Sequence, residues 1–217
     1  MRDLRFKRRA PLSGKARSMV VFVHGYGADG ADLLGLADPL GTHLPDTVFL
    51  SPDAPERCVG GGFGFQWFPI PWLDGSDVAL AERGLDLAAT DLNGFLDARL
   101  AEEGLGAEAL ALVGFSQGAM ISLHVAPRRP VAMAGVVAIS GRLLRPEALD
   151  EALVKPPVLL VHGDADPVVP FEDMGRAGQA LEAAGFEVYG HVMQGTGHGI
   201  APDGLSVALQ FLKGQLG

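Results

Sequence analysis

Short apolar runs alternate along this chain with longer segments in which apolar residues recur every three or four positions. The runs are uninterrupted, which is typical of strands that a parallel sheet buries on both faces. Strands are predicted at residues 19–23, 47–51, 109–113, 135–139, 157–161 and 187–193. Helices are predicted at residues 32–40, 77–103, 117–126, 146–153, 171–184 and 203–213. This alternation predicts an α/β fold, with a mostly parallel central sheet and helices on both faces.

Two segments depart from the alternation. Residues 1–18 hold seven basic residues and one acidic residue, and we interpret Leu4 to Gly14 as a solvated first strand and turn rather than part of a transit peptide. Residues 52–76 form a long irregular segment, and a loop of that length is usually functional or disordered. Its aromatic residues favour a function; they are Phe63, Phe65, Trp67, Phe68 and Trp72.

The composition restricts the class of protein. With 217 residues and 48% hydrophobic content, the chain fits a single globular domain over residues 1–217. Its net charge of −9 argues against a nucleic-acid partner, and no apolar run approaches the ~18 residues of a membrane span, so no stable membrane insertion is expected. Cys58 is the single cysteine, which fits a reducing, cytoplasmic location. The oligomeric state stays open, and a homodimer is one of the states allowed.

The sequence around Ser116 carries the clearest chemical signal. The apolar run at 109–113 leads without a spacer into Gly114-Phe-Ser-Gln-Gly118, and a helical segment follows until Pro127. A strand that turns directly into a helix leaves no room for side chains beside the apex, which explains glycines two positions before and two after the serine. This is the pattern of a nucleophile elbow, and the strand and helix around it are the context that the motif needs.

A serine nucleophile needs a base and an acid that orients the base. Ligands of open α/β sheets bind beyond the carboxyl ends of the strands, and three candidates follow strands: Ser116, Asp166 and His198. Their order along the chain is the order found in α/β-hydrolases. On the same loop, Asp164 is an alternative that could instead hold the turn, and we favour Asp166 because it is better placed to reach inward.

Six histidines compete for the role of base. His198 lies between two glycines, which leaves its ring free to approach Ser116, and we favour it. His43, His124 and His191 are expected to have surface or packing roles. His24 and His162 end strands near the site, where hydrogen bonds to loop backbone are the simpler expectation.

The oxyanion of a tetrahedral intermediate requires backbone donors. The N–H of Gln117 is one candidate, because it follows the nucleophile at the positive end of a helix. The second is expected in the turn His24-Gly-Tyr-Gly27, and we select the N–H of Tyr26.

These motifs together resemble the phospholipase/carboxylesterase family, which includes acyl-protein thioesterases and small bacterial carboxylesterases. The resemblance spans residues 20–200 and rests on motifs in matching order: His24-Gly-Tyr-Gly-Ala-Asp-Gly30, Pro52-Asp-Ala-Pro-Glu-Arg57, Gln66-Trp-Phe68, the elbow, His162-Gly-Asp-Ala-Asp-Pro-Val-Val-Pro170 and Gly197-His198. It implies an α/β-hydrolase fold without a separate cap domain. It also implies the triad Ser116, Asp166 and His198, with Tyr26 and Gln117 at the oxyanion hole, and it favours Asp166 over Asp164.

The sequence thus predicts a serine carboxylesterase that acts on short- to medium-chain esters through an acyl-enzyme on Ser116. The alternatives are a thioesterase or lysophospholipase with the same residues, or a non-catalytic binding protein that kept the fold. Trp67 and Phe68 are predicted to form the wall of the acyl groove, unless Trp67 packs into the core. The resemblance is loosest at residues 58–65 and 69–76, so the substrate stays open. We expect no metal and no organic cofactor, because no metal-ligand spacing and no dinucleotide fingerprint is present.

Overall fold

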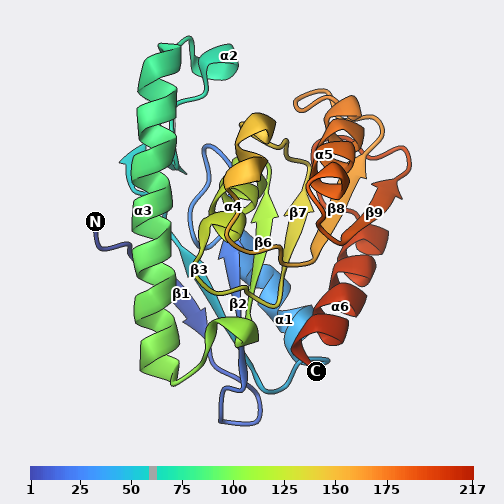
Figure 1. Ribbon diagram of the computed structural model, residues 1–217. Coiled ribbons are helices and arrows are strands. Elements are labelled where there is room, and N and C mark those ends of the chain that lie inside the picture. The colour runs from blue at the N-terminus through green and yellow to red at the C-terminus, as the bar shows by residue number, and fades with distance from the viewer. Residues whose placement is uncertain (59–62) are drawn as a thin grey trace.

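A central sheet of seven strands organises the molecule, with the order β1-β3-β2-β6-β7-β8-β9, in the computed structural model (Figure 1). The structure describes residues 1–58 and 63–217; residues 59–62, which belong to the segment predicted as a functional loop, lie outside the described residues. The strands are β1 (Phe6–Arg9), β2 (Ser18–Val23), β3 (Thr47–Pro52), β6 (Leu110–Phe115), β7 (Gly135–Ile139), β8 (Val158–Gly163) and β9 (Val188–Met193). The five pairings from β3 through β9 are parallel, and β1 joins the edge antiparallel to β3.

Helices connect the parallel strands, as the alternating pattern predicts. The α-helices are α1 (Ala37–Gly41), α2 (Pro71–Asp74), α3 (Val78–Glu103), α4 (Gln117–Val125), α5 (Glu172–Ala183) and α6 (Pro202–Leu216). Short 3-10 helices are η1 (Leu33–Leu36), η2 (Ala107–Ala109), η3 (Ala126–Arg128) and η4 (Pro146–Glu151), and a small hairpin is formed by β4 (Glu56–Arg57) and β5 (Phe65–Gln66). The helices predicted at 32–40 and 146–153 are thus partly or wholly 3-10 helices, the form that short pieces often take.

Both faces of the sheet are buried, which explains the uninterrupted apolar runs. In β2, Met19 and Val21 pack into the core under α3, α4 and α5, whereas Val20 and Phe22 point into the second core under α1 and α6. Figure 1 shows α3 and α4 in front of the sheet. Because successive side chains of a strand point to opposite faces, a strand between two helical layers must be apolar at every position.

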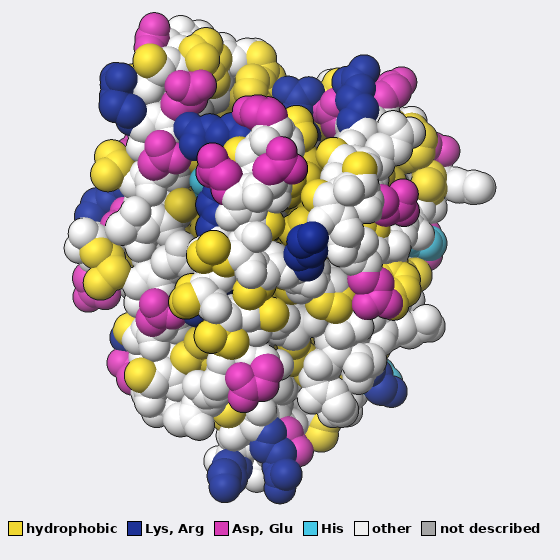
Figure 2. All heavy atoms as spheres, in the orientation of Figure 1, with side chains coloured by type: hydrophobic (Ala, Val, Ile, Leu, Met, Phe, Trp, Pro, Cys, Tyr) yellow, Lys and Arg dark blue, Asp and Glu magenta, His cyan; other side chains and the backbone are white. Residues whose placement is uncertain are grey.

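The basic N-terminal segment is an exposed edge strand, as predicted. Arginines of this segment form ion pairs with acidic residues of later elements: Arg2 with Asp91 and Glu56, Arg5 with Asp53, Arg8 with Glu103, Arg9 with Asp38 and Arg17 with Asp46. Charged side chains along an open edge also discourage pairing with another sheet. Figure 2 shows acidic and basic side chains interspersed over the visible face. In the described part of the chain, none of the helices has the length and apolarity needed to cross a membrane.

Candidate active site

Ser116 is the single residue between β6 and α4. Ser116 has φ of 53° and ψ of −116°, a conformation that costs free energy for any residue other than glycine. A Cβ on Gly114 would lie 2.4 Å from the carbonyl oxygen of Gly118, and a Cβ on Gly118 would lie 1.8 Å from that of Val23. Both glycines are therefore required by the close approach of two backbones, and the turn holds the serine at the carboxyl end of the sheet.

A continuous hydrogen-bonded chain leads away from this serine. The Oγ of Ser116 lies 3.0 Å from Nε2 of His198, and Nδ1 of His198 lies 2.7 Å from Oδ2 of Asp166. A carboxylate can only accept, so Nδ1 carries the proton and Nε2 is left to accept from the serine hydroxyl. The structure thus brings together the three residues that the sequence analysis selected, in the tautomer that a general base requires.

The loops that carry Asp166 and His198 are tied to each other by their backbones. The N–H of Gly195 donates to Oδ1 of Asp164 at 2.6 Å, and the N–H of Ala165 donates to the carbonyl of Thr196 at 3.1 Å. A Cβ on Gly163 would lie 2.2 Å from that same carbonyl oxygen. Asp164 therefore holds the turn, the role considered for it as the alternative to Asp166.

Asp166 is kept ionised by its hydrogen bonds. Burial alone would raise its pKa, but donation from His198 and from the N–H groups of Val168 and Val169 outweighs burial and holds the pKa below its ordinary value. The Asp166 side chain has no exposed surface, whereas that of His198 is 18% exposed. Beside it, the ring of Phe115 lies 5.0 Å from the imidazole, centre to centre, and limits its movement on one side.

None of the other five histidines, all of which the structure describes, is hydrogen-bonded to Ser116 or Asp166. His43 is exposed in a loop, and His191, which lies on β9, is paired with Asp203. His124 is buried in α4, where burial lowers its pKa to about 4, and the nearby charges of Arg128 and Arg145 act in the same direction.

Two further histidines bind loop backbone, as expected. His24 donates from Nδ1 to the carbonyl of Gly25 and accepts at Nε2 from the N–H of Ala54. Burial lowers the pKa of His24, which keeps this ring neutral. His162 binds the carbonyl of Val169 through Nε2.

The two predicted oxyanion donors come from neighbouring elements. Gln117 is the first residue of α4, where the backbone N–H groups point out of the helix end. Tyr26 lies in the turn after β2, and this turn is held by Gly27, whose N–H donates to the carbonyl of Phe65 at 3.0 Å. At Gly25, a Cβ would lie 3.3 Å from Cβ of Ser116, so the turn passes directly beside the nucleophile.

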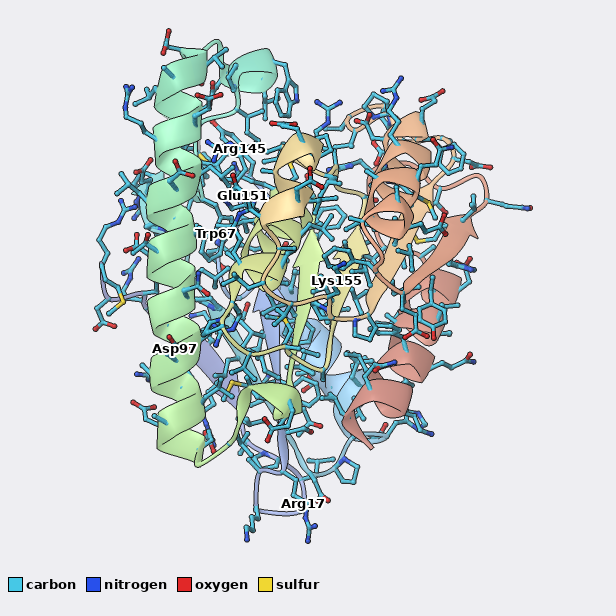
Figure 3. All side chains as sticks on the ribbon, viewed as in Figure 1. Arg17, Trp67, Asp97, Arg145, Glu151 and Lys155 are labelled. Atoms are coloured by element: carbon cyan, nitrogen blue, oxygen red, sulfur yellow. The ribbon has the colours of Figure 1, made fainter. Side chains whose placement is uncertain are left out.

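Trp67 is not a groove wall, and that prediction is wrong. The residue has no exposed surface and belongs to the core cluster beside α3 (Figure 3). Its indole Nε1 donates to the carbonyl of His24 at 2.9 Å, and its backbone N–H donates to Oε1 of Gln117 at 2.9 Å. A buried indole that finds a backbone acceptor is stable in a core, so Trp67 supports the turn after β2 from behind rather than contacting solvent.

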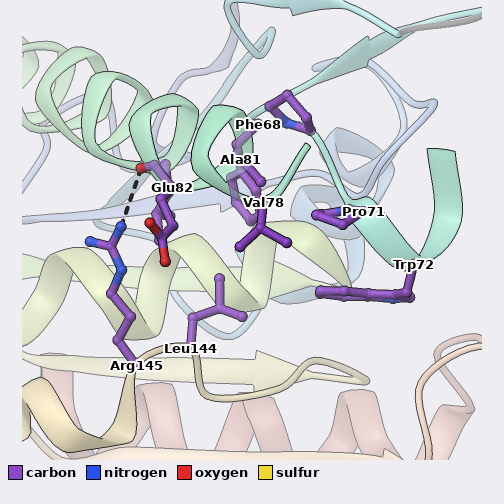
Figure 4. A pocket seen from close by; sticks show the side chains of 10 residues that line it. Phe68, Pro71, Trp72, Val78, Ala81, Glu82, Leu144 and Arg145 are labelled. Atoms are coloured by element: carbon purple, nitrogen blue, oxygen red, sulfur yellow. Dashed lines mark hydrogen bonds between the residues drawn. The ribbon is translucent and has the colours of Figure 1, made fainter. Parts of the chain in front are cut away.

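An apolar pocket of about 180 Å³ lies against the other end of this segment (Figure 4). Phe68 lines it; the other lining residues are Pro69, Pro71, Trp72, Val78, Ala81, Glu82, Leu85, Leu144 and Arg145. Figure 4 shows the Trp72 ring at one end and Arg145, bonded to the backbone of Glu82, at the other. The carbonyl of Phe68 accepts from Nε2 of Gln117 at 2.6 Å, which ties the pocket wall to the residue after Ser116.

Sequence reasoning missed two features of this site. The side chain of Gln117 binds the backbone of both Trp67 and Phe68, so the residue does more than offer its own N–H. The ring of Trp72 is covered by the guanidinium of Arg142 at 4.8 Å, which is itself bonded to Asp173. Neither contact leaves a signal in spacing or periodicity, because both join segments far apart in the chain. Among the described residues, no group of three or more His, Cys, Asp or Glu side chains could hold a metal ion.

Comparison with known proteins agrees with this geometry. Residues 10–216 match the family model described as Phospholipase/Carboxylesterase. The crystal structure of esterase PE8 is 42% identical, with a TM-score of 0.92 over 99% of this chain and all of that one. Acyl-protein thioesterase 1 of Saccharomyces cerevisiae is 30% identical over 93% of this chain and 94% of its own length, and Esterase YpfH of Escherichia coli is 27% identical over 91% and 83%.

The fold and the family model point to the same conclusion. The mostly parallel sheet with helices on both faces is the α/β-hydrolase fold that the sequence predicts, and the match covers nearly the whole chain. Its relatives are esterases and thioesterases, so the chemistry is hydrolysis. This chain belongs to the phospholipase/carboxylesterase family of hydrolases.

Proposed function

We propose that this protein is a serine carboxylesterase that hydrolyses short- to medium-chain esters through an acyl-enzyme on Ser116. One observation carries the proposal: the unbroken hydrogen-bonded chain from Oγ of Ser116 through His198 to the buried carboxylate of Asp166. A serine hydroxyl is a poor nucleophile until a base takes its proton, and this arrangement supplies that base in the correct tautomer.

The proposed reaction has two halves. Oγ of Ser116 attacks the ester carbonyl while Nε2 of His198 takes its proton, and the imidazolium then gives this proton to the leaving alcohol. Water, deprotonated by the same nitrogen, then attacks the acyl-enzyme and releases the acid. Asp166 stays ionised throughout and stabilises the imidazolium. The backbone N–H groups of Tyr26 and Gln117 are the proposed donors to the negatively charged oxygen of each tetrahedral intermediate.

The pocket beside Phe68 is the proposed binding site for the acyl chain. Apolar side chains provide most of its wall, and burying each methylene of a substrate there contributes up to about 0.8 kcal/mol. Trp72 is 55% exposed and Val78 is 62% exposed, so both offer apolar surface that the core does not use. These residues replace Trp67 as the proposed wall.

Hydrolysis of acyl thioesters is the second candidate. The observation that favours it is the similarity to Acyl-protein thioesterase 1, which extends over almost the full length of both chains. The proposed triad would serve a thiol leaving group equally well, because the thiolate needs less help from a proton donor than an alkoxide does.

A fluorophosphonate probe tests whether Ser116 is an activated nucleophile. We expect covalent labelling of the parent protein and no labelling of Ser116→Ala. Ser122→Ala is the control and should be labelled, because Ser122 is a buried serine of α4 whose hydroxyl donates to the carbonyl of Gly118. A panel of p-nitrophenyl esters and acyl thioesters then compares the two candidates. Absence of labelling in the folded parent would reject both and leave a binding protein with a hydrolase fold.

A further inference from the structure

A second imidazole lies beside the Asp166 carboxylate. His162 is buried near the end of β8, and its Nε2 lies 3.0 Å from the carbonyl oxygen of Val169 and 3.4 Å from Oδ2 of Asp166. A carbonyl oxygen only accepts, so Nε2 must carry the proton. The one N–H of Nε2 is hydrogen-bonded to that backbone acceptor, and Oδ2 of Asp166 lies beside it, within ion-pair distance but without a hydrogen bond of its own.

The two oxygens of Asp166 have different partners. Oδ1 accepts from the N–H groups of Val168 at 2.8 Å and Val169 at 3.0 Å, which fix it within its own loop. Oδ2 lies between the two imidazoles, with His198 at 2.7 Å and His162 at 3.4 Å. The oxygen that orients the base is thus the one that His162 faces.

His162 is the more deeply buried of the two histidines, with 2% of its side chain exposed against 18% for His198. It lies within a buried strand, in register with Val192 of β9, and the ring of Phe171 meets its imidazole edge-on with centres 6.1 Å apart. His198 instead follows a loop with glycines at 195 and 197. An imidazole within a buried strand beside Oδ2 is therefore suited to hold the carboxylate that the His198 ring contacts.

We propose that His162 is a positioning residue of the triad: its Nε2–H, bonded to the carbonyl of Val169, lies beside Oδ2 of Asp166 and keeps that oxygen in line with Nδ1 of His198. This inference rests on the proposed function of Ser116 and adds a fourth side chain beside its hydrogen-bonded chain. Two effects follow. Loss of the imidazole removes one of the two groups beside Oδ2, so this oxygen can shift although Oδ1 stays bonded to its loop. It also leaves more negative charge on the oxygen that faces His198, which favours the protonated imidazolium.

Two substitutions separate these effects from simple packing. His162→Phe keeps a ring of similar size against Phe171 but has no N–H, whereas the terminal amide nitrogen of His162→Gln reaches about as far as Nε2. We measure the rate of fluorophosphonate labelling between pH 5 and 9 and the kcat and KM for one p-nitrophenyl ester. For His162→Phe we expect kcat to fall by about tenfold to a hundredfold with KM changed little, and the acidic limb of labelling to move to higher pH. His162→Gln should restore most of kcat and the parent pH profile.

The chain offers a matched control in His191→Asn. His191 also pairs with an aspartate, Asp203 at 2.8 Å, but on the outer strand and away from Ser116, so the pH profile should stay that of the parent. If His162→Phe fails to fold, His162→Asn, whose amide nitrogen stops short of Nε2, takes its place with the same expectation.

The outcomes distinguish this inference from the proposed function. If the parent is not labelled, the function of Ser116 itself is rejected. If the parent is labelled but the donor-free variant keeps its pH profile and kcat, with only a lower melting temperature, His162 is structural and the inference is overturned. Equal losses in His162→Phe and His162→Gln would overturn it as well, because the donor would then be irrelevant.

Discussion

Two loop systems flank Ser116, and they are held in different ways. On one side, backbone groups join the loops that carry Asp166 and His198: the N–H of Ala165 donates to Thr196, the N–H of Gly195 donates to the Asp164 carboxylate, and Gly163 admits no Cβ. On the other side, the segment from Trp67 to Trp72 is held through side chains: the amide of Gln117, the indole of Trp67 and the guanidinium of Arg142 over Trp72.

This difference assigns different tasks to the two sides. Backbone hydrogen bonds form whatever side chain is present, and Gly163 has no space for a Cβ, so the side with Asp166 and His198 keeps one geometry, which acid–base chemistry requires. Side-chain contacts can be exchanged one at a time without moving the elbow, so the side of the apolar pocket can change the substrate while the reaction stays the same. The predictions below challenge this division of tasks.

The largest effect is expected at the nucleophile. Ser116→Ala should lower kcat by about 10⁶-fold, because no other group can form the acyl-enzyme, and the fold should persist because glycines 114 and 118 allow the turn. Steady-state kinetics together with a thermal melt measure both quantities. Ester hydrolysis within tenfold of the parent would remove Ser116 from the mechanism.

The acid of the triad should have the next largest effect. Asp166→Asn should lower kcat by about 10⁴-fold, since an amide accepts less strongly and no longer selects the tautomer of His198. Asp164→Asn is the matched control on the same loop, because Asp164 binds Gly195 rather than the base. Equal losses in the two variants would mean that the loop, and not its carboxylate in the triad, is what matters.

The same contrast explains how far the sequence could predict the site. Ser116, Asp166 and His198 each follow a strand of a parallel sheet, and the topology of such a sheet brings its carboxyl ends together. Glycine spacing identifies the elbow because the close backbone approach excludes every other residue. At these positions the strand order, the turn and the residue types all indicate the same site, so local sequence patterns are sufficient to predict it.

The pocket side could not be predicted in this way. Trp67 and Trp72 lie five positions apart in one aromatic segment, yet one has no exposed surface and the other is 55% exposed. Which ring faces the core depends on Gln117 and His24, whose contacts with this segment span 43 to 50 positions. An irregular segment has no period that assigns its faces, so an aromatic residue there fits a core and a groove equally well.

Replacing Trp67 tests its place in the core. Trp67→Ala should lower the free energy of unfolding by about 3–5 kcal/mol, the usual cost of a large buried cavity, and should slow hydrolysis of acetyl and hexanoyl esters alike. Trp67→Phe keeps most of the ring but leaves the carbonyl of His24 without its donor, so it should lower kcat for both esters with a smaller loss of stability. Chemical denaturation and the ratio of the two rates measure these effects. A changed ratio of the two rates with an unchanged free energy of unfolding would mean that Trp67 contacts the acyl chain.

Acid should remove stability that Asp166 provides. The pKa of Asp166 is lower in the folded protein than in the unfolded chain, so its hydrogen bonds stabilise the fold fully above the unfolded value of about 3.9, and this stability is lost as the pH falls through the lower folded value. The difference in unfolding free energy between the parent and Asp166→Asn should therefore shrink below about pH 4. Urea titrations at pH 7 and at pH 3 measure it. A difference that stays constant between the two pH values would contradict the shift.

The smallest effect is expected at Trp72, and it tests the pocket directly. This indole forms one end of the proposed acyl site and is 55% exposed, so Trp72→Ala should leave the melting temperature nearly unchanged. Without this wall, the longer substrate should lose the burial of about one methylene, ~0.8 kcal/mol. This loss lowers the hexanoyl-to-acetyl ratio of kcat/KM about fourfold. Tyr189→Ala is the matched control, because this aromatic residue is also exposed but lies on β9, at the edge of the sheet. If both variants keep the parent ratio, the acyl chain binds elsewhere. If only Trp72→Ala changes the ratio, the segment from Trp67 to Trp72 determines which substrate is preferred.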